Sequence, residues 1–82
     1  MESKEKAVYA ILHEESAKLK MSWLRVWESK DDQRTIPTYN LAIEDLEKAR
    51  KIYEEIGYKE AEQEIRGKIN KVRKKLEEIT TN

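Results

Sequence analysis

Large apolar residues recur at helical spacing along the first third of the chain. In residues 3–29 they share one face at about 100° per residue, the mark of an amphipathic helix. This face is made of Val8, Ile11, Leu12, Leu19, Trp23, Val26 and Trp27. Because aromatic side chains bury the most area, we expect this face to lie in the core, with Trp23 and Trp27 as anchors.

A second apolar group in the same segment lies on nearly the opposite face. It consists of Ala10, Ala17, Met21 and Leu24. Two opposed apolar faces indicate either that this helix is the central one and is buried on both sides, or that one face is spare and the chain associates through it. We expect this second group to be an interaction face, which binds either another copy of the chain in a homodimer or a partner helix.

The second helix is predicted at residues 37–56, after a loop at 29–38. Pro37 disfavours helix at Ile36 but is tolerated in a first helical turn, and Thr35 or Thr38 is expected to cap the helix. Its apolar positions recur at alternating intervals of four and three, as packing along a neighbouring helix requires. They are Ala42, Leu46, Ala49, Tyr53 and Ile56.

A third helix is predicted at residues 58–79, directly after Gly57. Glycine adopts the left-handed conformation that ends many helices, and so short a link makes the second and third helices antiparallel neighbours. The apolar positions of the third helix are Tyr58, Ala61, Ile65, Ile69, Val72, Leu76 and Ile79. The whole pattern predicts a single all-α domain over residues 1–82, a three-helix up-down-up bundle. Its expected core anchors are Trp23, Trp27, Leu46, Tyr53, Ile65, Ile69 and Leu76.

The composition narrows the classes of function. Lys plus Arg and Asp plus Glu both number 17, which argues against a mainly electrostatic binder of nucleic acid. No apolar run approaches the roughly 20 residues that span a bilayer, and no signal peptide is evident, so we expect a soluble and, if natural, cytoplasmic protein. The abundance of Glu and Lys is typical of heat-adapted proteins and of designed helical proteins alike.

No motif predicts chemistry. His13 is the only histidine, and position 17, where a helical zinc motif needs another ligand, is alanine. The basic segment at residues 66–75 divides its charges between both flanks of its helix, which favours a solvated surface over a nucleic-acid interface. We therefore expect no catalytic residue, cofactor, metal or small-molecule ligand, and we keep nucleic-acid binding through residues 66–75 as a distant alternative.

Tyr39, Ala42, Leu46 and Ala49 stand at the spacing of the second helix of a tetratricopeptide repeat, and the stretch "IYEEIGYKEAE" is similar to the link into a following repeat. Residues 39–67 thus weakly resemble a tetratricopeptide hairpin. The resemblance implies a pair of antiparallel helices and a role in protein–protein interaction. The first-helix pattern of that family is missing from residues 26–33.

Two functions follow from the sequence. One is a structural scaffold without activity, indicated by consistent apolar faces and mixed surface charge. The other is a protein–protein interaction module that uses the spare face of the first helix. The oligomeric state separates them, because only the second predicts association that rises with concentration.

Overall fold

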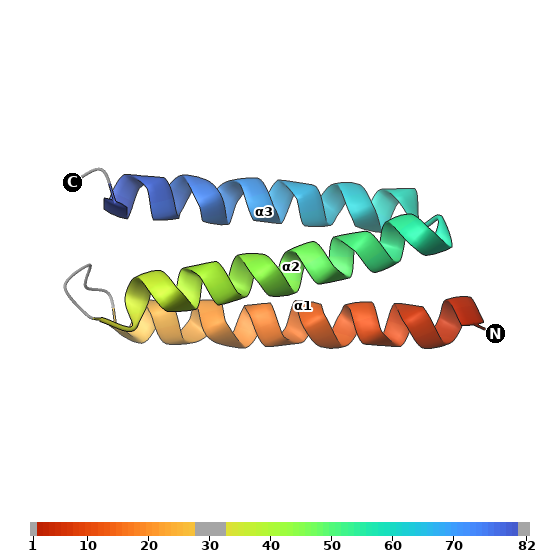
Figure 1. Cartoon of the computed structure of the whole chain (residues 1–82), viewed down its shortest axis with the longest axis horizontal. Coiled ribbons are helices and arrows are strands. Elements are labelled where there is room, and N and C mark those ends of the chain that lie inside the picture. Colours follow the sequence, from red (N-terminus) through yellow and green to blue (C-terminus); the bar gives the residue numbers. More distant parts are fainter. Residues whose placement is uncertain (1, 28–32, 81–82) are drawn as a thin grey trace.

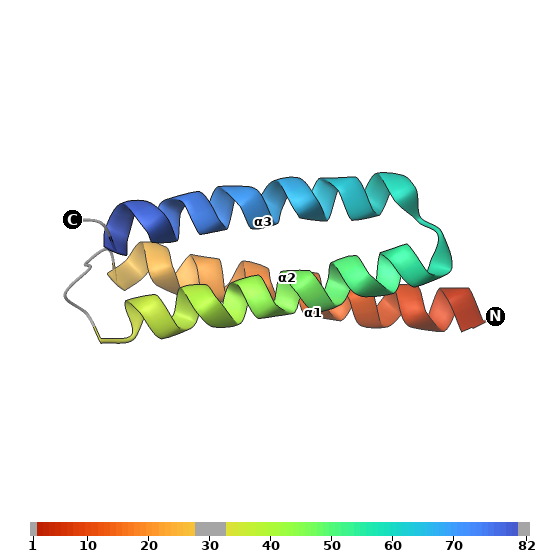
Figure 2. The same cartoon turned by 45° about the horizontal axis from the view of Figure 1, so that its top comes forward.

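The computed structural model describes residues 2–27 and 33–80. They form α1 (Glu2–Trp27), α2 (Thr35–Ile56) and α3 (Lys59–Thr80), with no strand among them. The helices run up, down and up as an elongated bundle (Figure 2) with principal extents of 45 × 18 × 14 Å, and α2 lies between the other two (Figure 1). The prediction of an all-α three-helix bundle is confirmed.

The central position of α2 determines how the bundle packs. It touches α1 along one side and α3 along another, whereas no Cα atom of α1 comes within 8 Å of one in α3. Small residues of both helices are fully buried in the bundle, among them Ala10 of α1 and Ala42 and Ala49 of α2. Alanine lets two helix backbones come close, so helix α1 packs tightly on α2 through its small residues.

The core contains most of the anchors expected on α2 and α3. Leu46, Tyr53, Ile65 and Ile69 are buried, and Leu76 is partly buried against them. Tyr58 is not part of this core, because it precedes α3 and is 44% exposed.

The helix ends differ from the sequence predictions in three places. Ser3 lies inside α1 and therefore does not cap it. Helix α2 begins at Thr35, two residues before the predicted start, and its N-cap is Arg34, which makes no side-chain capping hydrogen bond, so neither Thr35 nor Thr38 caps it. Helix α1 is described as far as Trp27, so the predicted end at Ser29 and residues 29–32 of the predicted loop lie outside the described residues, whereas residues 35–38 of that loop belong to α2.

Gly57 ends α2 as expected. It has φ 79° and ψ 19°, in the left-handed region, and its N–H donates to the carbonyl of Glu54. The N–H of Tyr58 donates to the carbonyl of Tyr53, which closes the turn between α2 and α3. These bonds satisfy carbonyl groups that the end of a helix leaves without partners.

The two glycines predict opposite effects of the same substitution. Gly57→Ala should lower the free energy of unfolding by about 1–2 kcal/mol, because a side chain is strained at this positive φ. Gly67→Ala should raise it by about 0.5–1 kcal/mol, because Gly67 lies within α3 with open space around the added Cβ. Urea unfolding followed by circular dichroism measures both, and effects of equal sign would contradict this assignment.

Candidate interaction face

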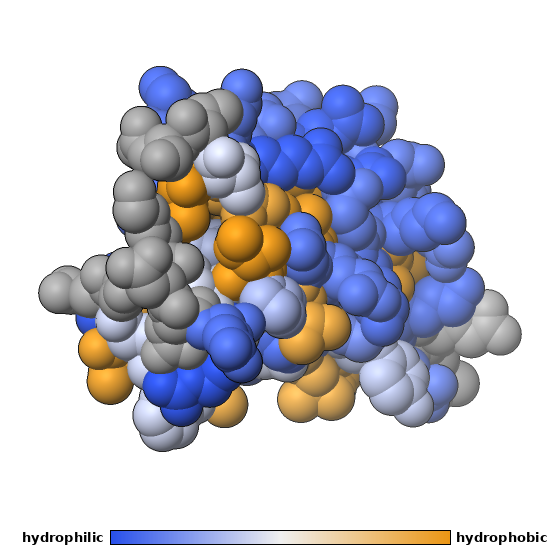
Figure 3. Space-filling model, turned by 60° about the vertical axis from the view of Figure 1, so that its left-hand side comes forward, coloured by the Kyte–Doolittle hydropathy of each residue, from blue (hydrophilic) through white to orange (hydrophobic). Residues whose placement is uncertain are grey.

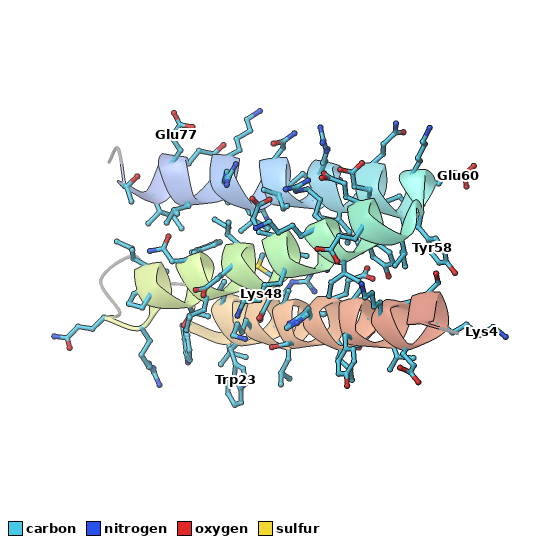
Figure 4. All side chains as sticks on the ribbon, turned by 45° about the vertical axis from the view of Figure 1, so that its right-hand side comes forward. Lys4, Trp23, Lys48, Tyr58, Glu60 and Glu77 are labelled. Atoms are coloured by element: carbon cyan, nitrogen blue, oxygen red, sulfur yellow. The ribbon has the colours of Figure 1, made fainter. Side chains whose placement is uncertain are left out.

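The large apolar side chains of α1 face solvent rather than the core. We call Val8, Ile11, Leu12, Leu19, Trp23 and Val26 the outer stripe; their exposed fractions range from 49% for Ile11 to 71% for Val26. The prediction that these residues form the core is wrong. Figure 4 shows Trp23 pointing away from α2 and α3, and Figure 3 shows apolar side chains at the surface along the edge where α1 lies.

The two tryptophans therefore occupy different environments. Trp23 is 51% exposed, whereas Trp27 is partly buried against the core. Their rings stack with centroids 6.1 Å apart, and the guanidinium of Arg34 lies 4.4 Å from the centroid of Trp27. Trp27 is held by this cation–π contact and by the core, which leaves Trp23 as the exposed aromatic residue of the outer stripe.

The face that the sequence left as spare is the one that packs in the bundle. Ala10, Ala17 and Leu24 are buried, and Met21 is partly buried against the core. The prediction that these four residues form an interaction face is therefore wrong. Polar partners lie on the same side of α1, since Glu14, Ser16 and Lys20 all reach side chains of α2 or α3.

The outer stripe is large for the surface of one small domain. Six large apolar side chains that are about half exposed present on the order of 500–700 Å² in total on this side of α1, compared with about 300–600 Å² for the largest apolar patch of a typical monomer. From Val8 to Val26 the strip is roughly 27 Å long at the helical rise of about 1.5 Å per residue. Its length and width match one face of another helix.

A polar cluster between α1 and α2 brings together residue types found in hydrolases. Ser16 Oγ donates to Asp45 Oδ2 at 2.8 Å, Lys20 Nζ donates to the same oxygen, and His13 Nδ1 lies 3.9 Å from Asp45 Oδ1. A catalytic triad needs the serine bonded to the histidine, which then accepts its proton. Here serine, histidine and lysine all converge on the carboxylate, an arrangement that holds two helices together.

The electrostatics of the cluster fit a structural role. Burial disfavours the charged form of Asp45, but hydrogen bonds from Lys20 and Ser16 outweigh it and hold the pKa of this carboxyl below its usual value. The side chain of His13 is half-buried beside Asp45. Sequence spacing did not single out Asp45, because its partners come from another helix.

A second polar contact joins all three helices. The Tyr53 hydroxyl of α2 donates to Glu14 Oε2 of α1, and Lys68 of α3 lies 3.6 Å from the other oxygen of Glu14. Burial and the hydrogen bond to Glu14 raise the pKa of Tyr53 above its ordinary value. The contact fixes α1 and α3 relative to each other where their backbones stay apart.

A groove of about 390 Å³ lies between α1 and α3, and the pair of Glu14 and Lys68 is part of its lining. Met21, Leu46 and Val72 also line it, and the basic segment contributes Lys68, Lys71 and Lys75. Arg66 and Arg73 of the same segment instead line a second groove, between α2 and α3, and Arg66 pairs with Glu62 on α3 at 3.0 Å. The charges of residues 66–75 therefore do not gather on one surface suited to a nucleic-acid backbone.

Other kinds of site have no support in the part of the chain that the structure describes. Within residues 2–27 and 33–80, no three His, Cys, Asp or Glu side chains stand close enough together to hold a metal ion. None of the described helices is both long and apolar enough to cross a membrane. The chain matches no protein-family model, no curated protein and no solved structure.

Proposed function

We propose that this protein is a non-catalytic protein–protein interaction module that binds an amphipathic helix along the outer stripe of α1. The observation that carries the proposal is that Leu12, Leu19 and Trp23 are exposed, while the buried core of the bundle is formed by other residues. Tryptophan is enriched among the residues that contribute most to binding energy in interfaces. Apolar residues repeated along one helix face are the usual means of helix–helix recognition.

A purely structural role fits this surface less well. The solvent side of a scaffold helix is expected to carry charged and polar residues, because an exposed apolar strip favours unwanted association. The outer faces of α2 and α3 follow that rule at many positions; Lys51, Glu55 and Lys74, for example, are exposed. Apolar residues are concentrated on the solvent side of α1, which indicates that this surface is covered by a binding partner when the protein performs its function.

The proposal is tested by titration with a synthetic amphipathic helix of leucine, glutamate and lysine that lacks tryptophan. Because Trp23 is 51% exposed, covering the outer stripe should shift the tryptophan emission to shorter wavelength. Leu19→Glu should weaken binding at least tenfold, since it places a charge in the centre of the contact. Leu41→Glu is the matched control, because Leu41 is 49% exposed on α2, outside the stripe.

Two results would overturn the proposal. One is an emission spectrum that does not change at saturating peptide. The other is an equal loss of binding in the two variants, which would show that peptide capture depends on general surface hydrophobicity. Circular dichroism of both variants should match that of the parent chain, because neither leucine belongs to the buried core.

A further inference from the structure

We propose that the helix bound by the outer stripe is α1 of a second copy of this chain, packed antiparallel about a two-fold axis near residue 17. This inference rests on the proposed function and names the partner of the same face. It follows from the spacing of the outer stripe, the charges along it and the area that it exposes.

The outer face of α1 has the spacing of a helix-pairing seam. Leu12, Leu19 and Val26 follow one another at intervals of seven residues, which places them at equivalent a positions of a heptad. The d positions, four residues before each, are Val8, Glu15 and Ser22. The seam is thus apolar at both ends, and it has a charged d position near its middle.

Antiparallel packing of two α1 helices buries the apolar residues at both ends of this seam. With the axis near residue 17, each a position faces a d position of the other copy, so that Val26 meets the partner's Val8 and Leu12 meets the partner's Ser22. The small serine leaves room beside the partner's Leu12 for the indole ring of Trp23, which flanks the seam. Both apolar ends are then covered, and Leu19 packs on the aliphatic part of the partner's Glu15.

The charges near the centre select the antiparallel orientation. In that orientation the same flank of each helix meets, so the two Lys18 side chains lie near the axis, and the Glu15 carboxylate of each copy lies beside the partner's Lys18 and offsets the repulsion between the lysines. In a parallel pair, equal residues face each other, and the two Glu15 carboxylates would meet within the seam. Neither Glu15 nor Lys18 forms an ion pair with another described residue, so both are available to the partner.

The exposed area is suited to a second copy of equal extent. The outer stripe alone presents on the order of 500–700 Å², and the stems of flanking Lys18 and Arg25 add to it, compared with about 800 Å² that each partner buries in a standard interface. Because α2 packs on the other side of α1 and α3 lies beyond α2, the second copy reaches the stripe without displacing them (Figure 1). An isologous contact also closes on itself, which prevents open-ended assembly.

The first experiment reverses the central charges and measures the dimer dissociation constant by sedimentation equilibrium of the full chain. Glu15→Lys and Lys18→Glu should each weaken the dimer roughly tenfold, since each breaks two symmetric pairs and creates like-charge contacts. The double variant Glu15→Lys/Lys18→Glu should restore most of the affinity. Failure of the double variant to recover would rule out the antiparallel register.

The second experiment measures orientation directly. The chain has no cysteine, so Lys4→Cys carries a single spin label at the exposed start of α1 (Figure 4). Since residue 4 lies 13 residues from the axis near residue 17 in each copy, the two labels should be roughly 40 Å apart at about 1.5 Å rise per residue. A label separation of roughly 10–15 Å, close to the distance between two packed helix axes, would show a parallel pair and overturn the inference.

The outcomes separate this inference from the function on which it rests. A chain that stays monomeric at every concentration, yet binds the synthetic helix through Leu19, refutes the second copy and keeps the interaction module. A chain that dimerises but keeps its affinity in the Leu19→Glu variant refutes the outer stripe as the dimer interface. If dimerisation is lost in Leu19→Glu and kept in Leu41→Glu, the result supports the outer stripe as an interaction face and a second copy of the chain as its partner.

Discussion

Ile65→Ala is expected to lower the free energy of unfolding by about 2–5 kcal/mol, the largest effect of any single substitution discussed above. Ile65 of α3 is 1% exposed and is the largest side chain that the bundle buries completely. Its truncation removes apolar contacts and leaves a cavity that rigid helices fill only in part. For a domain of this size the melting temperature should fall by roughly 10–25 °C, as measured by calorimetry or circular dichroism.

Leu19→Ala is the matched control for Ile65→Ala. It deletes a side chain of the same volume class from α1, but Leu19 is 62% exposed. In dilute solution, where copies do not associate, the change should stay within about 0.5 kcal/mol. A large loss from Leu19→Ala in the monomer would mean that the outer stripe belongs to the core, and it would contradict the orientation of α1.

Asp45→Ala is expected to lower the free energy of unfolding by about 1–3 kcal/mol, because it removes the acceptor of the Ser16 hydroxyl and the charged partner of the partly buried Lys20 amine, which keeps only its hydrogen bond to Ser16 among the described residues. Glu44→Ala is a neighbouring control, since Glu44 is exposed and, within residues 2–27 and 33–80, forms an ion pair only with Lys48 one turn along α2. Its effect should stay within about 0.5 kcal/mol. Equal effects would show that the cluster adds no more than a surface ion pair.

The contribution of Asp45 should also depend on pH. Its pKa is lower in the folded chain than in the unfolded chain, so its stabilising contribution is complete above the unfolded value of about 3.9 and is lost as pH falls through the lower folded value. The difference in unfolding free energy between the parent chain and Asp45→Ala should therefore be constant near neutral pH and shrink below about pH 4. Urea unfolding at several pH values measures this.

Helices α2 and α3 could be predicted closely because each has one apolar face. The seam of Leu46 and Tyr53 on α2, and that of Ile65 and Ile69 on α3, is buried where spacing placed it. Gly57 ended α2 at the expected residue, since its conformation depends on the local chain alone. In such segments the local pattern and the global packing require the same arrangement, so the sequence is sufficient.

For helix α1 the apolar pattern alone did not predict which face is buried. It carries apolar residues on two opposed faces, and the larger one is the more obvious core by area. The bundle buries the smaller face instead, because Ala10 and Ala17 let α1 approach α2 closely, and because Ser16 and Lys20 on that side find their acceptor in Asp45. These partners come from another helix, so periodicity within α1 gave no sign of them.

The sequence by itself determined that this chain forms three helices, where α2 stops and which sides of α2 and α3 face inward, because those features depend on local conformation and on a single apolar periodicity. Only the tertiary structure decided which side of α1 is buried. That choice depends on how closely two backbones approach and on polar partners distant in the chain. Because the tertiary structure buries the face of Ala10, Ala17, Met21 and Leu24, the candidate interaction face is the outer stripe around Leu19 and Trp23.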